Sequence, residues 1–261
     1  TDEAYRRFGN NYYTPNVGYQ AGKLRNSRVR NTHEPIVMLN YTWDMSGNTR
    51  LNAATSLRFG KNGYSALTWN GGSDPRGDYY RFMPSSDFTQ IVPGITTDET
   101  IYFYMQDALT ARSVWDGMID YDQLYNRNHY IDTELTSLMG NSYRSNYMIE
   151  ERHTDQLDYN FAANVEHNMR NNMRIVGGVN LRVNRTNYYS QVKDLMGGDY
   201  WYDVDKFAER DMASATAAQN DLDYYWATGH ARGVRRGDKY GYNYRAHLLE
   251  TNAWANYTWG I

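Results

Sequence analysis

Closely spaced acidic side chains are the first residues of this chain that could do chemistry. They form two groups: Asp203, Asp205, Glu209 and Asp211, and Asp120, Asp122 and Asn126. Oxygen ligands of this kind suit Ca²⁺, but neither group has the full ligand spacing with its turn glycine. The 6 histidines do not pair at zinc-ligand spacing, and there is no cysteine. We therefore predict no metal, no cofactor and no catalytic residue, and no feature selects a glycosidase-type carboxylate pair.

Two aromatic clusters are better candidates for ligand contact. They are Tyr200, Trp201 and Tyr202, and Tyr224, Tyr225 and Trp226. Flat rings with polar tips suit sugars, peptides or a partner protein, and exposed aromatic rings are costly without such a use. The alternative is that they pack the small core of their own segment. A basic cluster, Arg232, Arg235, Arg236 and Lys239, would hold lipid phosphates or another anion, or would simply keep its loop soluble.

Composition narrows the class of protein. The 27 Lys and Arg residues against 30 Asp and Glu give a net charge of -3 with both signs scattered, which argues against nucleic acid as a partner. The longest aliphatic run, Ile36 to Leu39, is far shorter than the ~20 residues of a membrane helix. With 26 Tyr, 7 Trp and 7 Phe, the composition is typical of β-structure.

Apolar and polar residues alternate with a period of two along several segments, which predicts half-buried strands. In the first segment Val37, Leu39 and Tyr41 share one face with Trp43. The strands are predicted at about 36–45, 49–59, 155–168, 172–187 and 240–259. The last has a less regular alternation, and we expect a β-bulge near Leu248 and Leu249.

The connections alternate strictly between short and long. Tight turns follow the first and third strands, whereas residues 60–154 and 188–239 form the long connections. Outer-membrane barrels have this asymmetry, because their short turns lie at one end and their long extracellular loops at the other. Ten strand residues tilted by ~45° rise roughly 24 Å, close to the apolar band of such barrels. The tetrapeptide Asn-Tyr-Thr-Trp occurs twice and places Trp43 and Trp259 where an aromatic girdle would lie.

A soluble antiparallel sheet with one solvated face would show the same alternation. The loop lengths and terminal tryptophans favour instead an all-β fold, an antiparallel transmembrane β-barrel segment with long extracellular loops. Membrane barrels need at least about eight strands, so we expect residues 1–261 to be a partial barrel domain of a longer protein.

Three segments resemble TonB-dependent receptors of Bacteroidetes-type outer membranes. They are Gly18 to Arg28, leading into Glu34-Pro35; Asp74-Pro75-Arg76 followed by Asp78 to Ser85; and Ile119 to Tyr125. The resemblance implies part of a 22-stranded barrel with a plugged lumen. The plug domain and the TonB-contacting box of that family are not in this segment.

The resemblance also implies a function: active transport of a scarce, bulky nutrient across the outer membrane of a Gram-negative bacterium, energised through TonB. The expected partners are outer-membrane lipid, the TonB system acting through the plug, a surface lipoprotein and a nutrient ligand of unknown identity. Two alternatives stay open, namely a passive porin-like barrel and a soluble β-rich carbohydrate-binding or adhesion module.

Overall fold

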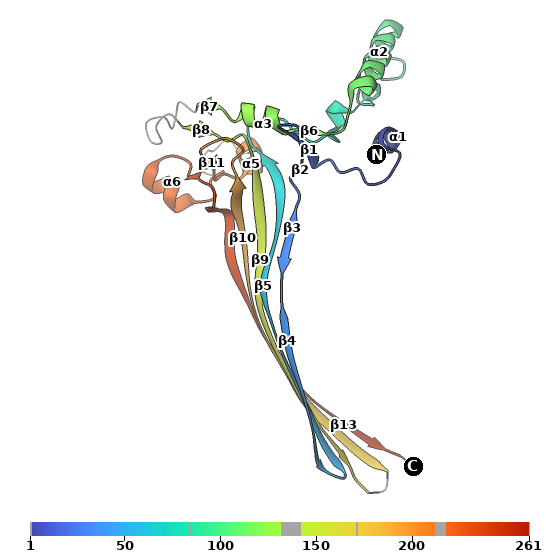
Figure 1. The fold of residues 1–261 in the computed structure, drawn as a ribbon, viewed down its shortest axis with the longest axis vertical. Coiled ribbons are helices and arrows are strands. Elements are labelled where there is room, and N and C mark those ends of the chain that lie inside the picture. Colours follow the sequence, from blue (N-terminus) through green and yellow to red (C-terminus); the bar gives the residue numbers. More distant parts are fainter. Residues whose placement is uncertain (1, 84, 132–141, 171, 212–217, 261) are drawn as a thin grey trace. The chain divides into compact units, whose positions relative to one another are not determined.

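The computed structural model describes residues 2–83, 85–131, 142–170, 172–211 and 218–260. The chain is mostly β, and its main feature is one six-stranded sheet in the order β13-β10-β9-β5-β3, with β4 also paired to β5 (Figure 1). Its strands are β3 (Arg30–His33), β4 (Ile36–Ser46), β5 (Thr49–Trp69), β9 (Tyr147–Asn168), β10 (Met173–Asp194) and β13 (Lys239–Trp259). The β3–β5, β4–β5 and β10–β13 pairs are antiparallel. The prediction of an all-β, antiparallel fold is confirmed.

The chain divides into two compact units. Unit 1 comprises Thr1–Val29, Ser65–Glu150 and Val192–Gly237, and unit 2 comprises Arg30–Tyr64, Glu151–Gln191 and Asp238–Ile261. Unit 2 contains most of the long sheet. Unit 1 contains the helices and the short strands, together with the remaining ends of β5, β9 and β10.

Each predicted strand of the sheet is present, but three of them extend beyond the predicted ends. The prediction was wrong in assigning Gly60 to Trp69, Tyr147 to Thr154 and Tyr188 to Asp194 to loops. In unit 1 the ends of β5 and β9 are buried on both faces, as at Ala66 and Leu67 and from Tyr147 to Glu150. A strand buried on both faces loses the alternation of apolar and polar residues, so the pattern ended before the strand did.

The irregularity in β13 lies at a different place from the predicted bulge. Leu248 and Leu249 pair in unbroken register with Asn184 and Val183. The register shifts instead between Tyr189 and Ser190, which face Asn243 and Tyr240. Two residues of β13, Gly241 and Tyr242, therefore lie between these pairs. Gly241 has φ +70°, a backbone conformation that glycine adopts without steric cost.

The described residues outside the sheet form helices and short strands. The helices are α1 (Asp2–Phe8), α2 (Asp98–Val114), α3 (Tyr121–Arg127), α5 (Lys206–Asp211) and α6 (Leu222–Thr228), with 3-10 turns at Tyr80–Phe82 and Asp87–Gln90. The short strands are β1 (Val17–Gln20), β2 (Lys23–Asn26), β6 (Ile119–Asp120), β7 (Tyr130–Ile131), β8 (Tyr143–Arg144), β11 (Trp201–Tyr202) and β12 (Gly233–Val234). Across the described residues, no helix has the length and apolar content needed to cross a membrane.

Unit 1 brings together the segments that carry the family resemblance. The segment from Gly18 to Arg28 contains the β1–β2 hairpin, which pairs with β6 at Gly18↔Ile119 and Tyr19↔Asp120. A Cβ atom on Gly18 would lie 1.8 Å from the carbonyl oxygen of Ile119, so only glycine permits this approach. The core beneath it is formed by Leu67, Ile119, Tyr121, Leu124, Tyr147, Ile149 and Met196.

Candidate membrane interface and ligand pocket

One face of the unit 2 sheet is an exposed apolar surface, which we call the apolar band. It consists of alternate residues of 37–45 on β4, 51–59 on β5, 157–165 on β9, 173–183 on β10 and 249–259 on β13. Register aligns these residues across strands, for example Val37 with Leu57 and Val179 with Ala253. Their side chains are exposed or half-buried, at 66% for Leu39 and 49% for Val179, with Phe161 and Leu181 half-buried.

The opposite face, which we call the polar face, is mostly polar and hydrogen-bonded on β5, β9 and β10, whereas the edge strands also expose Met38 and Trp254 there. Asp158 is buried there and binds two guanidinium groups, with Arg182 Nε at 3.0 Å and Arg58 Nη2 at 3.3 Å from its oxygens. Asn52 donates to Asn164 Oδ1 at 3.2 Å. These contacts join β5, β9 and β10 through polar side chains, so the intervening apolar residues of all three strands point the other way. A hollow of about 330 Å³ lies on the polar face.

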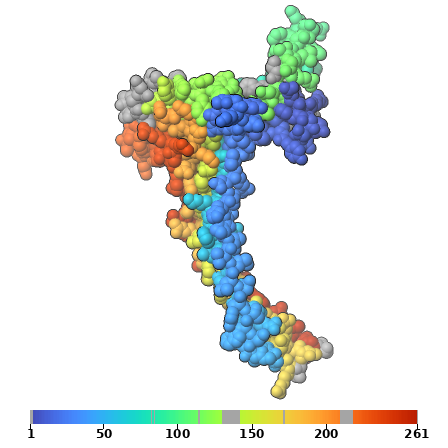
Figure 2. Space-filling model, viewed as in Figure 1, coloured from blue at the N-terminus to red at the C-terminus, as the bar shows by residue number. Residues whose placement is uncertain are grey.

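The sheet has two long open edges. β4 pairs with β5, and β13 pairs with β10, so each presents its other side without a strand partner among the described residues. Every residue of β4 is exposed, and in Figure 2 the blue atoms of β3 and β4 lie at the surface. Soluble proteins protect such edges with prolines, charges, bulges or very short strands. From Ile36 to Trp43, β4 has none of these.

The repeated tetrapeptide places one tryptophan on each edge strand at the end of the sheet with the tight turns. Trp43 pairs with Leu51, and Trp259 pairs with Met173. Both are exposed, at 49% and 64%. Amphipathic rings at the rim of an apolar surface are typical of a membrane–water interface.

Unit 1 contains a pocket of about 450 Å³ lined by two of the family-like segments. One wall runs from Ser73 to Gly77 and the other includes Trp115, Gln123 and Arg127. Asp74 is buried and accepts hydrogen bonds from two guanidinium nitrogens of Arg76. The Arg76 guanidinium also lies 5.4 Å from the centre of the Trp69 ring. Gln123 and Arg127 are exposed on α3 and present hydrogen-bond donors at the mouth of the pocket.

Two aromatic side chains donate hydrogen bonds to the backbone of this pocket. Trp115 Nε1 donates to the carbonyl oxygen of Gly77 at 3.0 Å, and the Tyr13 hydroxyl donates to that of Gly117 at 2.8 Å. A Cβ atom on Gly77 would lie 2.0 Å from the Gly117 oxygen. Burial raises the pKa of Tyr13 to about 12, and the Asp78 carboxylate adds to the shift. The phenol therefore stays protonated and remains a donor near neutral pH.

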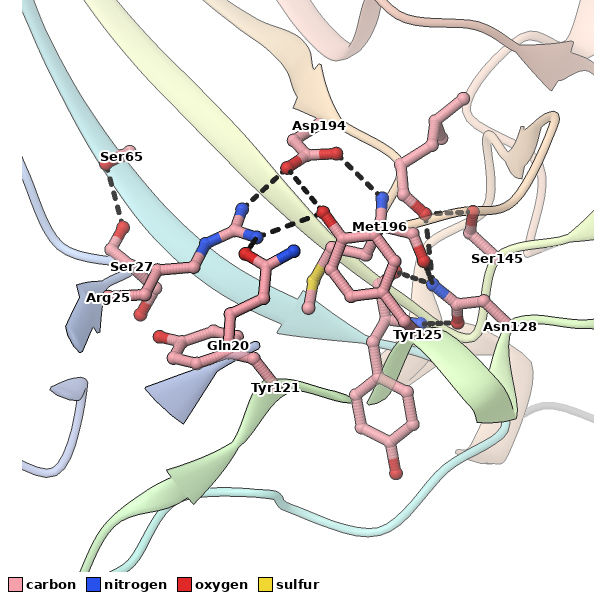
Figure 3. Close-up of polar contacts among 12 residues, drawn as sticks. Gln20, Arg25, Ser27, Ser65, Tyr121, Tyr125, Asn128, Ser145, Asp194 and Met196 are labelled. Atoms are coloured by element: carbon pink, nitrogen blue, oxygen red, sulfur yellow. Dashed lines mark hydrogen bonds and ion pairs between the residues drawn. The ribbon is translucent and has the colours of Figure 1, made fainter. Parts of the chain in front are cut away.

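A polar network in unit 1 connects the β1–β2 hairpin to the end of β10 (Figure 3). Arg25 lies 2.6 Å from Asp194 Oδ2, donates to Gln20 at 2.6 Å and to Tyr125 at 3.0 Å, and stacks over Tyr121. Burial alone would raise the pKa of Asp194. The Met196 amide and the Arg25 guanidinium outweigh that effect and hold the pKa below its ordinary value.

Asn128 is a second anchor of unit 1, and its side chain is fully buried. Its Oδ1 accepts from the amides of Asn146 and Tyr147, and its Nδ2 lies 2.7 to 3.0 Å from the carbonyl oxygens of Tyr147, Leu195 and Met196. The side chain replaces the backbone partners that these groups would otherwise need. Both networks satisfy their own polar groups, so we assign them a structural role.

The predicted aromatic contacts lie in two different environments. Tyr200 and Trp201 are in the core of unit 1, exposed by 1% and 4%. The ring of Tyr202 is half-buried with the guanidinium of Arg144 4.4 Å above it. On α6, Tyr224 and Tyr225 are half-buried, and Trp226 is 72% exposed. Ligand contact through these residues stays a prediction, and Trp226 is the best placed of them.

Some members of the acidic and basic clusters make local contacts, and the side chains of Glu209 and Asp211 lie outside the described residues. Asp120 caps α3, and Asp205 accepts from the Phe207 amide at the start of α5. Arg232 lies 3.2 Å from Asp221. The described residues contain no group of three or more His, Asp or Glu side chains placed to hold a metal ion.

Sequence reasoning missed Arg127, Gln123 and Trp115 as pocket residues. Their only signal was membership of, or proximity to, a family-like segment. Comparisons with family models, with curated proteins and with solved structures give no match to this chain.

Proposed function

We propose that this chain is part of an outer-membrane β-barrel transporter whose unit 2 sheet faces lipid through the apolar band. The exposed apolar band opposite a hydrogen-bonded polar face carries the proposal. A continuous apolar surface on five strands is too large for an ordinary soluble monomer. In a membrane barrel the same arrangement is required, since alternate residues face lipid and lumen.

The dimensions of the band support a bilayer. It covers 9 to 11 residues of each strand, and at ~3.4 Å per residue and ~45° tilt these rise about 22 to 26 Å, against an apolar band of ~25 Å in known barrels. The open edges of β4 and β13 support closure by further strands, because a barrel abolishes edges altogether.

The finer proposal is import of a bulky nutrient, energised through TonB. It is supported by the resemblance of three segments to TonB-dependent receptors and by the pocket in unit 1 that two of these segments line. We propose that unit 1 is extramembrane and binds the nutrient at this pocket, with Arg127 and Gln123 as donors. Loops carry such binding functions because they vary without cost to the strands.

Cysteine labelling tests the membrane orientation, since the chain has no cysteine of its own. Val179→Cys and Asn180→Cys are adjacent positions on opposite faces. In intact bilayers, a water-soluble maleimide should label Asn180→Cys and leave Val179→Cys unlabelled, whereas a lipid-soluble maleimide should label Val179→Cys. Efficient labelling of both positions by the water-soluble reagent would exclude the membrane orientation and favour a soluble binding module.

Nutrient uptake tests the transport function. Cells with and without the full-length protein are grown on a complex mixture of peptides and glycans, and depletion of each component is followed by mass spectrometry. We expect a component whose depletion requires the protein and stops when a protonophore collapses the proton-motive force. Depletion that persists after collapse would indicate a passive porin.

The pocket assignment is tested in the same assay. Arg127→Glu should reduce depletion, and Arg236→Glu, a matched charge reversal on an exposed residue outside the pocket, should not. Equal uptake by the two variants would exclude Arg127 from ligand binding.

A further inference from the structure

A row of basic side chains lies directly beyond the apolar band on the same face of the sheet. We call it the cationic row. On β5 and β10, Lys61 and Arg185 follow the last band residues, Phe59 and Val183, by two positions, so they share the face of the band. Register extends the row to the neighbouring strands through His33↔Lys61 and Arg185↔His247.

Lys61 and Arg185 also line one hollow of about 340 Å³. Leu157, the first band residue of β9, contributes to its lining, as does Asn187. Asn187 accepts from Arg245 Nε at 2.7 Å, which brings a third cation next to the hollow. The site therefore combines an apolar wall on the side of the band with cations on the other side.

A carboxylate, Asp155, also lines the hollow; its Oδ2 is hydrogen-bonded elsewhere, and its Oδ1 is buried without a hydrogen-bond partner among the described residues. Oδ2 accepts from the Tyr189 hydroxyl at 2.9 Å, and Oδ1 lies 3.6 Å from His153 Nδ1. Among the described residues, no carboxylate lies at ion-pair distance from Lys61 or Arg185, and both side chains are exposed. Their charges are thus available to an external anion.

We propose that the cationic row binds the phosphate of a membrane lipid whose acyl chains lie on the apolar band. This inference rests on the proposed membrane orientation. A phosphate at the level of Lys61 and Arg185 would receive charge-assisted hydrogen bonds from both. The acyl chains of the lipid would continue past Leu157 onto the band. A soluble anion has no hydrocarbon to make this contact.

The experiment measures lipid retention by the full-length protein in phosphatidylcholine vesicles that contain a minor fraction of phosphatidate. After gentle extraction, native mass spectrometry counts the protein molecules that carry phosphatidate. Lys61→Gln/Arg185→Gln should lower phosphatidate affinity about 30-fold, equivalent to about 1 kcal/mol for each cation. Lys61→Arg/Arg185→Lys, which keeps both charges, should retain most of the affinity.

A matched control removes two cations from the opposite face, at pairs three residues further along β5. Arg30 pairs with Tyr64, and Arg152 lies over the Tyr64 ring, so Arg30→Gln/Arg152→Gln leaves the band face unchanged. It should bind phosphatidate as the parent does. Equal losses in the control and in Lys61→Gln/Arg185→Gln would overturn the site.

The remaining outcomes separate this inference from the proposed function. If the parent protein does not float with phosphatidylcholine vesicles, the membrane proposal itself fails. If it floats but retains phosphatidate no better than Lys61→Gln/Arg185→Gln, only the lipid site fails. If inorganic phosphate displaces the lipid completely, the site recognises free phosphate and the lipid assignment is overturned.

Discussion

Placing a charge on the apolar band distinguishes a lipid-facing sheet from a water-facing one. Val179→Arg introduces a guanidinium at a side chain that is 49% exposed and pairs with Ala253 across to β13. On a water-exposed sheet this substitution should change the free energy of unfolding very little. In a bilayer it forces a charge into hydrocarbon.

The magnitude follows from the position of Val179 within the band. On β10 the band runs from Met173 to Val183, so Val179 lies about one residue from its middle, roughly 2 Å along the bilayer normal. An arginine at this depth costs about 2 to 4 kcal/mol of the free energy of unfolding. A surface substitution on a soluble protein changes it by only about 0.5 kcal/mol.

The assay is reversible chemical unfolding of the full-length protein in lipid vesicles, followed by tryptophan fluorescence. Asn180→Arg is the matched control, since Asn180 is the next residue on the strand and pairs with Asn252 on the polar face. It should cost less than about 1 kcal/mol because its side chain faces water. Equal costs at the two positions, or a negligible cost at Val179, would refute the assignment of the two faces.

Three further predictions concern individual residues. Asn128→Ala should lower the stability of unit 1 by about 2 to 4 kcal/mol, because it leaves buried amides and carbonyls without partners; faster hydrogen exchange at the Tyr147 amide checks this. The depressed pKa of Asp194 contributes stability that is present above the ordinary aspartate pKa of ~3.9 and is lost as the pH falls through its lower folded value. Acid unfolding curves should therefore lose this contribution in Asp194→Asn, and an unchanged curve would contradict it. Gly241→Ala should cost about 1 to 2 kcal/mol because of its positive φ, whereas Gly47→Ala, in open space without one, should be nearly neutral in thermal unfolding.

The periodicity of the sequence was sufficient to predict five of the six strands of the sheet and the apolar face of each; the short strand β3 was missed. Alternation at Val37, Leu39 and Tyr41 is a local property, because successive strand residues point to opposite faces whatever the strand pairs with. The register of β4 with β5 pairs the residues of the predicted apolar face of one strand with those of the other. A shift of one residue would have reversed every side chain.

Only the tertiary structure decided where those strands end and which side chains meet. The ends of β5 and β9 are buried on both faces in unit 1, so no alternation marks them. Tyr200 and Trp201 are residue types that often contact ligands, but here they are packed in the core. Their burial depends on neighbours that are distant in the chain. Arg25 and Asp194 are 169 residues apart in sequence and 2.6 Å apart in space. Neighbouring residues determine the alternation that predicts a strand, whereas a site depends on contacts that form only in the folded chain.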